Sequence, residues 1–141
     1  MNYQDFIKRV QESTGETSPK EAKRITEAIL EVLGERLSRI HRKHMAAQLP
    51  GELHLAVVEE DPAQQFPLEE FYNRVAARLD LNFHEAIVTS RGVMKAVAEA
   101  VAPGEINDIV AGLPTEYAEL FVREVVGRSG LDVHPLAPLA P

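Results

Sequence analysis

Two short stretches of this chain repeat the same junction. Residues 46–53 read AAQLPGEL, and residues 110–117 read VAGLPTEY. Proline disfavours helical geometry at the preceding residue and suits the first turn of a following helix. Each stretch therefore predicts a corner between two helices rather than a surface recognition motif. The four corner residues are Leu49, Pro50, Leu113 and Pro114, and we expect both leucines to point inward.

The two junctions are 64 residues apart, and other positions recur at the same distance. Glu35 aligns with Glu99, and apolar positions coincide on both sides of the junction. A shift of 65 residues pairs an earlier block, in which Phe6, Arg9 and Val10 align with Phe71, Arg74 and Val75. Because apolar positions, prolines and helix caps align together, the pattern indicates an internal duplication.

Each copy has the apolar spacing of amphipathic helices. In the first copy, an apolar face recurs at the helical period, at Tyr3, Phe6, Ile7 and Val10. Ser18 followed by Glu21 predicts a capped helix start, and Asn82 followed by Glu85 predicts the matching start in the second copy. These two helices are expected to run to about Leu37 and Ala102, and shorter ones are expected at 41–48, 50–58, 105–112 and 114–127.

These features predict an all-α protein. We expect a compact bundle of about eight helices, formed by two tandem four-helix repeats that pack in a non-parallel way as one globule. The repeats are placed at residues 1–58 and 68–127, with a polar linker at 59–67. Residues 128–141 form a Pro-rich tail, which is expected to be extended and solvated.

Composition narrows the class of protein. A hydrophobic fraction of 45% supports a packed interior, and the absence of cysteine excludes disulfides and thiolate metal sites. No apolar run approaches the roughly 18 residues that a membrane span needs. The first ten residues lack the apolar stretch of a secretory signal. We therefore expect a cytoplasmic protein without a membrane partner.

The net charge of −7 is unevenly distributed. Residues 1–57 carry nine Lys and Arg against eight Asp and Glu, a net charge of +1. Residues 58–141 carry six against fourteen, a net charge of −8. This balance disfavours general binding to nucleic acid or anionic lipid. The acidic second half favours a partner with a basic surface.

The most basic stretch is RIHRKH, residues 39–44. Its candidate phosphate-binding residues are Arg39, Arg42 and Lys43, although no aromatic side chain lies within it for base stacking. A solvated helix face is the preferred interpretation, so a nucleic-acid partner is not expected, and weak nucleic-acid contact through this stretch is an alternative function. The stretch also holds His41 and His44, which with His54 could ligate a metal, but ordinary surface histidines are the preferred explanation of the spacing. No metal or other cofactor is predicted.

Catalytic motifs do not emerge from the sequence. It has no GxSxG, no phosphate-binding loop and no glycine-rich dinucleotide fingerprint, so the pattern favours a non-catalytic protein. Four aromatic side chains could line a cleft between the repeats that takes a small apolar ligand, or could instead fill the core. They are Phe71, Tyr72, Tyr117 and Phe121. The preferred interpretation is a helical module that binds another protein or itself.

Several motifs occur in order along the chain and together resemble a known family. They are YQDFIKRV at 3–10, AAQLPGEL, FPLEEFYNRVA at 66–76 and VAGLPTEYAELF at 110–121. The chain resembles the bacterial domain of unknown function 2267 family over about residues 1–127. The resemblance implies an all-helical fold built from a duplicated unit, with no established activity and no catalytic residues to transfer. One departure is Gly112, which stands where the first copy has Gln48.

Overall fold

The structure, a computed structural model, describes residues 1–57, 62–127 and 130–135. The first half contains α1 (Tyr3–Thr14), α2 (Pro19–Arg36), α3 (Arg39–Gln48), the 3-10 helix η1 (Gly51–Leu53) and α4 (His54–Val57). The second half contains α5 (Leu68–Leu79), α6 (Phe83–Ala100), α7 (Pro103–Ala111), the 3-10 helix η2 (Thr115–Glu119), β1 (Val122–Gly127) and β2 (Gly130–Pro135). Seven α-helices are therefore present in the described residues, against about eight predicted, and the predicted helical class is confirmed for the body of the protein.

The starts of the two long helices follow the predicted caps. Ser18 accepts a hydrogen bond from the Glu21 N–H at 3.2 Å, and Asn82 accepts one from the Glu85 N–H at 2.8 Å. Glu85 completes a capping box, since its carboxylate accepts the Asn82 N–H at 2.9 Å. The corresponding return bond is not formed by Glu21, which binds Arg24 instead.

Both Leu-Pro junctions form corners with the same proline backbone geometry. Pro50 has φ −53° and ψ 141°, and Pro114 has φ −53° and ψ 146°. Leu49 is buried, whereas Leu113 is half-buried and packs against the edge of the core. The chain after each corner forms a short 3-10 helix instead of the predicted α-helix, and only the first is followed by a further helical turn, α4.

The prediction of a helix over 114–127 is wrong in its second part. Residues 122–127 form β1, which pairs antiparallel with β2 from Val122↔Pro135 to Gly127↔Gly130. The β1 segment VREVVG is rich in valine, a residue type that favours extended backbone. The predicted tail over 128–141 thus contains a strand, while 136–141 lie outside the described residues.

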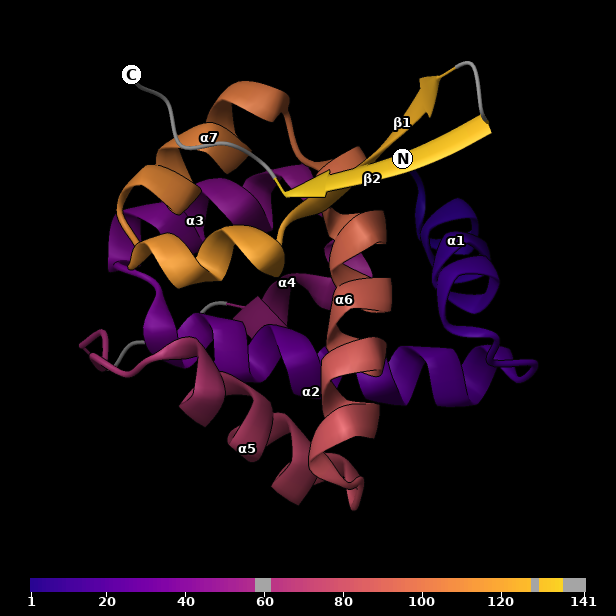
Figure 1. Cartoon of the computed structure of the whole chain (residues 1–141), viewed down its shortest axis with the longest axis horizontal. Coiled ribbons are helices and arrows are strands. Elements are labelled where there is room, and N and C mark those ends of the chain that lie inside the picture. Colours follow the sequence, from indigo (N-terminus) through magenta and orange to yellow (C-terminus); the bar gives the residue numbers. More distant parts are fainter. Residues whose placement is uncertain (58–61, 128–129, 136–141) are drawn as a thin grey trace.

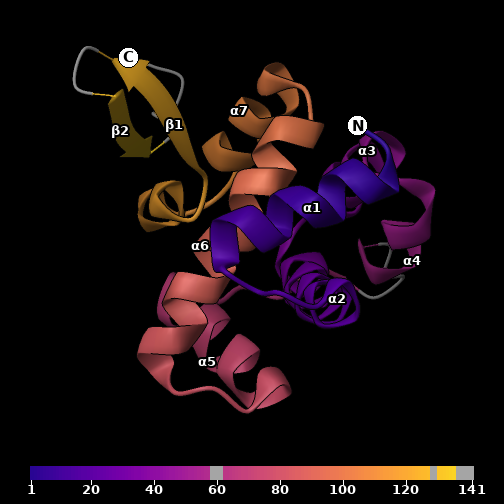
Figure 2. The same cartoon turned by 90° about the vertical axis from the view of Figure 1, so that its right-hand side faces the viewer.

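The two 18-residue helices, α2 and α6, cross at the centre of the fold (Figure 1). Helix α1 contacts both α2 and α6, and α5 likewise contacts both (Figure 2). Each long helix is therefore covered by the first helix of its own half and by the first helix of the other half. In the described residues no helix combines the length and apolar character needed to cross a membrane.

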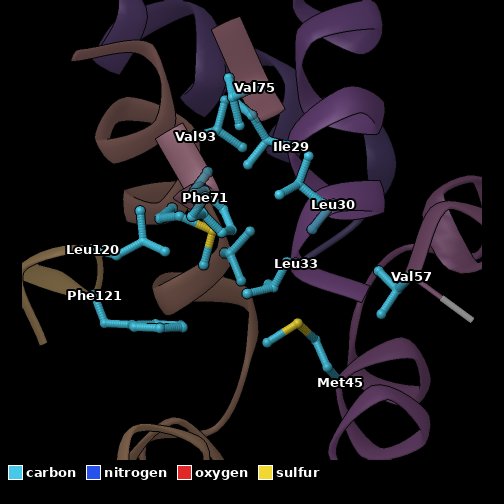
Figure 3. Packing of buried hydrophobic residues seen from close by; sticks show 14 of the residues in the cluster. Ile29, Leu30, Leu33, Met45, Val57, Phe71, Val75, Val93, Leu120 and Phe121 are labelled. Carbon is cyan, nitrogen blue, oxygen red and sulfur yellow. The ribbon is translucent and has the colours of Figure 1, made fainter. Parts of the chain in front are cut away.

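A single apolar core joins the halves (Figure 3). Fully buried side chains come from all seven α-helices and from the segment after η2, and include Ile29, Leu33, Met45, Phe71, Val93, Leu120 and Phe121. Burial of each such side chain stabilises the fold by about 1.5–3 kcal/mol relative to exposure. Because neither half encloses these residues alone, the core depends on contacts between halves.

The linker ends against this core. The Gln64 N–H donates to the Glu35 carbonyl at 2.8 Å. The carbonyl of the buried residue Phe66 accepts hydrogen bonds from Arg36 Nε at 2.9 Å and from the Tyr117 hydroxyl at 2.8 Å. Arg74 lies over the Phe66 ring, 4.0 Å from its centroid. Residues 62–67 are therefore fixed to the helices on both sides, although they form no helix themselves.

Ion pairs also connect the halves. Arg9 of α1 binds Glu99 of α6 with two hydrogen bonds, of 2.6 and 2.8 Å. Arg74 of α5 binds Glu35 of α2 at 3.1 Å, and Arg78 binds the other oxygen of Glu35 at 2.5 Å. Burial opposes ionisation of Glu35, but the hydrogen bonds from Arg78 and Arg74 outweigh it and lower the pKa of this carboxyl below its usual value.

Candidate functional site

An open groove of about 520 Å3 lies between α5, α6 and η2. Its volume is within the range of ligand-binding pockets. Eight side chains line it: Leu68, Glu69, Tyr72 and Asn73 from α5, Phe83 and Ile87 from α6, and Glu116 and Glu119 from η2. The groove therefore lies within the second half of the protein and not between the two halves.

The base of the groove is aromatic. The rings of Tyr72 and Phe83 meet edge to face, with centroids 6.0 Å apart and planes at 87°. Tyr72 also packs edge to face on the core residue Phe71, at 6.0 Å. Tyr72 is buried, but Phe83 keeps 43% of its surface exposed. The Phe83 ring thus presents an apolar face to solvent at the first turn of α6, directly after the Asn82 cap.

Carboxylates form the rim of the groove. Glu116 accepts the Leu68 N–H at 3.0 Å and so caps α5, whose N-cap residue Pro67 supplies no side-chain bond. Glu119 accepts the Tyr72 hydroxyl hydrogen bond at 3.1 Å, and Glu69 is exposed to solvent. Among the described residues, no Lys or Arg pairs with any of the three. The groove therefore combines an apolar base with a rim of three carboxylates.

The phenol of Tyr72 is not poised for proton transfer near neutral pH. Burial raises the pKa of this hydroxyl well above its usual value, and the charge and hydrogen bond of Glu119 raise it further. Arg91 opposes this shift only in part. Tyr72 is consequently a hydrogen-bond donor that holds Glu119 in place, and its hydroxyl stays protonated.

The structure separates the four residues of the predicted cleft. Phe71, Tyr117 and Phe121 are fully buried and belong to the core, and only Tyr72 lines the groove. The Tyr117 hydroxyl donates to the linker carbonyl of Phe66, and burial raises its pKa to about 12. Three of the four aromatic residues thus fill space that the cleft interpretation left open to a ligand.

The predicted basic patch does not form one exposed surface. Arg39 and Lys43 are exposed, but Arg42 is only 2% exposed and is buried with the core-facing side of α3. Binding to phosphate needs a continuous positive surface. Because Arg42 is buried, the candidate patch keeps two exposed cations instead of three. Sequence reasoning placed all three charges in solvent, although Arg42 stands one helical turn before the buried residue Met45.

The histidines of the first half serve separate contacts. His44 Nδ1 lies 3.2 Å from Glu105 of α7, and His54 Nε2 lies 2.8 Å from the Leu49 carbonyl. His41 is beside Gly112, where an added Cβ would approach its ring to 3.3 Å. Within residues 1–57, 62–127 and 130–135, no group of three or more His, Asp or Glu is arranged to hold a metal ion.

The departure at Gly112 has a structural reason. Gln48 of α3 accepts the Ala102 N–H at 2.6 Å and so satisfies a donor at the start of α7. At the aligned position, Gly112 faces His41, where even a methyl group would be in tight contact. Helices α3 and α7 meet closely at both places, so the first half supplies an amide side chain and the second half supplies space.

Comparison with known proteins identifies the family but not an activity. The family model described as "Uncharacterized conserved protein (DUF2267)" matches residues 3–120. No curated protein matches the chain. The family match begins at the first residue of α1 and ends just before β1, so it covers the helical body and the groove. The chain therefore belongs to the DUF2267 family of uncharacterised conserved proteins.

Proposed function

We propose that this protein is a cytoplasmic, non-catalytic helical module that binds a segment of a partner protein in the groove between α5, α6 and η2. The observation that carries the proposal is the half-exposed Phe83 ring, which stands over the buried Tyr72 ring in an open groove of about 520 Å3. Aromatic side chains that combine a fixed position with an exposed apolar face are typical anchors of protein interfaces.

The open shape of the groove favours a polypeptide over a small apolar ligand. Sites for small ligands bury most of the ligand surface, whereas a groove along helices accommodates an extended or helical segment. The groove side chains offer carboxylates and a phenol whose pKa is raised, but among the described residues they offer no histidine, serine or lysine. These groups favour binding over catalysis.

We also infer that the helical body is a tandem duplication. Helices α1 and α5 each have 12 residues, and α2 and α6 each have 18. The ion pair Arg9–Glu99 has its counterpart in Arg74–Glu35, at the positions that the 65- and 64-residue shifts align. The 65-residue shift aligns the two arginines and the 64-residue shift aligns the two glutamates, so the same ion pair occurs twice. Two unrelated halves would have no reason to share this contact.

If the halves are copies, the groove belongs to one copy only. At the aligned positions, the first copy has Pro19 in place of Phe83 and Lys23 in place of Ile87. Neither replacement is aromatic, and Lys23 places a positive charge where the second copy has an apolar side chain. The first copy therefore contributes to the fold, and the second copy carries the binding surface.

Quantitative affinity capture from a native lysate tests the proposal. Phe83→Asp places a charge on the groove base, and Asp is well tolerated in the first turn of a helix. Val88→Asp is the matched control, since Val88 is 53% exposed on the same helix and does not line the groove. We expect a protein that is retained by the wild type and by Val88→Asp but is lost with Phe83→Asp. Equal retention by all three, or no retained protein, contradicts the proposal.

A further inference from the structure

We infer that the groove takes a basic amphipathic segment of its partner, with a Lys or Arg side chain between the carboxylates and apolar side chains over the aromatic base. This inference rests on the proposed function and specifies the chemistry of the partner. Three carboxylates and two rings carry it, together with the contrast between these carboxylates and others in the same molecule.

The carboxylates that line the groove come from two elements. Glu69 lies in the first turn of α5, and Glu116 and Glu119 lie on η2 and bond to α5 at the Leu68 N–H and the Tyr72 hydroxyl. A Lys or Arg side chain has an aliphatic stem that packs on apolar surface and a charged head that reaches a polar rim. The rings of Tyr72 and Phe83 suit that stem, and the rim suits the head.

Two of these carboxylates are held in place before any partner binds. Glu116 uses one oxygen to accept the Leu68 N–H, and Glu119 uses one oxygen to accept the Tyr72 hydroxyl. In each case the other oxygen has no hydrogen-bond partner among the described residues. A fixed carboxylate with an available oxygen loses less conformational entropy on binding a cation than a freely rotating one does.

Three carboxylates elsewhere in the fold, by contrast, are already paired with arginine. Glu35, Glu70 and Glu99 each bind an arginine of the same chain at 3.1 Å or less. The groove carboxylates have no such partner in the described part of the chain. The second half, to which the groove belongs, has a net charge of −8. Charge complementarity therefore selects a cationic partner, and the apolar base selects one that also carries aliphatic side chains.

The inference is tested by fluorescence anisotropy with a labelled amphipathic peptide of Lys and Leu, and with a companion peptide in which Glu replaces Lys. The full chain is used as wild type, as Glu69→Gln/Glu119→Gln, and as Glu12→Gln/Glu31→Gln. The last variant loses the same charge from exposed positions on α1 and α2, outside the groove. The amide that replaces the Glu119 carboxylate can still accept the Tyr72 hydrogen bond, and circular dichroism verifies that each variant is folded.

We expect the Lys peptide to bind the wild type and the control variant alike, and the Glu peptide to bind neither. Because the groove variant loses two exposed charge pairs, its affinity for the Lys peptide should be about 2-fold to 30-fold weaker than that of the wild type. Binding should also weaken as salt is raised. Absence of Lys-peptide binding, or an equal loss in the control variant, overturns the inference.

Failure of the inference and failure of the proposed function have different signatures. Suppose that a lysate protein requires Phe83 but binds Glu69→Gln/Glu119→Gln as tightly as the wild type. The inference of a basic partner segment is then wrong, whereas the proposed binding function still holds. Light scattering tests whether a second copy of the chain occupies the groove instead. Dimerisation that is lost on Phe83→Asp would also overturn the assignment to a separate partner protein.

Discussion

Replacement of Gly92 by alanine tests the packing that unites the two halves. Gly92 lies in α6 where α1 crosses it, and the Ser13 hydroxyl of α1 donates to the Gly92 carbonyl at 2.6 Å. A Cβ added at Gly92 would lie 2.7 Å from Thr14 Cγ2 and 3.1 Å from the Ser13 carbonyl oxygen. One of these neighbours is backbone, so rotation of a side chain alone cannot make room for the new methyl group.

Two opposing effects set the magnitude. Alanine is favoured over glycine within a helix by about 1 kcal/mol. Overpacking of a well-packed contact costs about 1–3 kcal/mol, and distortion of the Ser13–Gly92 hydrogen bond costs about 0.5–1.5 kcal/mol more. Thr14 cannot turn away freely, because its hydroxyl donates to the Val10 carbonyl at 2.7 Å. The balance is a net destabilisation of about 0.5–3.5 kcal/mol.

Urea denaturation followed by far-ultraviolet circular dichroism measures this effect. Gly104→Ala is the matched control, since Gly104 is in α7 and an added Cβ there has no neighbour within 4 Å. We expect Gly104→Ala to leave the free energy of unfolding unchanged or to raise it. A Gly92→Ala protein as stable as the wild type would refute the close crossing of α1 and α6.

Three further outcomes follow from particular contacts. Tyr117→Phe should lower the free energy of unfolding by about 1 kcal/mol in urea denaturation, because the Phe66 carbonyl loses one of its two donors. Asn82→Ala should lower it by about 0.5–2 kcal/mol through loss of the capping box, with a cooperative transition preserved. The folded-state pKa of Glu35 is lowered by Arg78 and Arg74, so its contribution to stability is present above its usual pKa of 4.5 and is lost as the pH falls through the folded value. The difference in unfolding free energy between wild type and Glu35→Gln should therefore be largest at neutral pH and shrink in acid; a difference that grows in acid would refute the assignment.

Local signals in the sequence predict much of the helical body. The caps at Ser18 and Asn82 and the long helices after them depend on residues a few positions apart, which a sequence displays directly. The region after Pro114 is different. The extended conformation of β1 depends on pairing with residues 130–135. The proline-rich composition of the tail gives no sign of this pairing. Strand pairing of this kind is set by tertiary contact as much as by propensity.

The candidate site is less accessible to sequence reasoning. Phe71 and Tyr117 recur at apolar helical spacing, and such positions face the core whether or not they are aromatic. Phe83 escapes prediction, although it continues the stripe of buried positions Ala86 and Ser90 in α6. It stands in the first turn, and only the arrangement of α5 and η2 around it makes a groove. The burial of Arg42 could have been predicted from its position one turn before Met45, on the apolar stripe of α3.

The binding groove is tested most directly by a 1H–15N NMR titration of the full chain with the Lys/Leu peptide. We expect shift changes that are confined to the first turns of α5 and α6 and to η2, around Tyr72, Phe83 and Glu119. Changes centred on helices α1 and α3, which do not line the groove, or spread evenly over all acidic positions, would contradict a site at this groove.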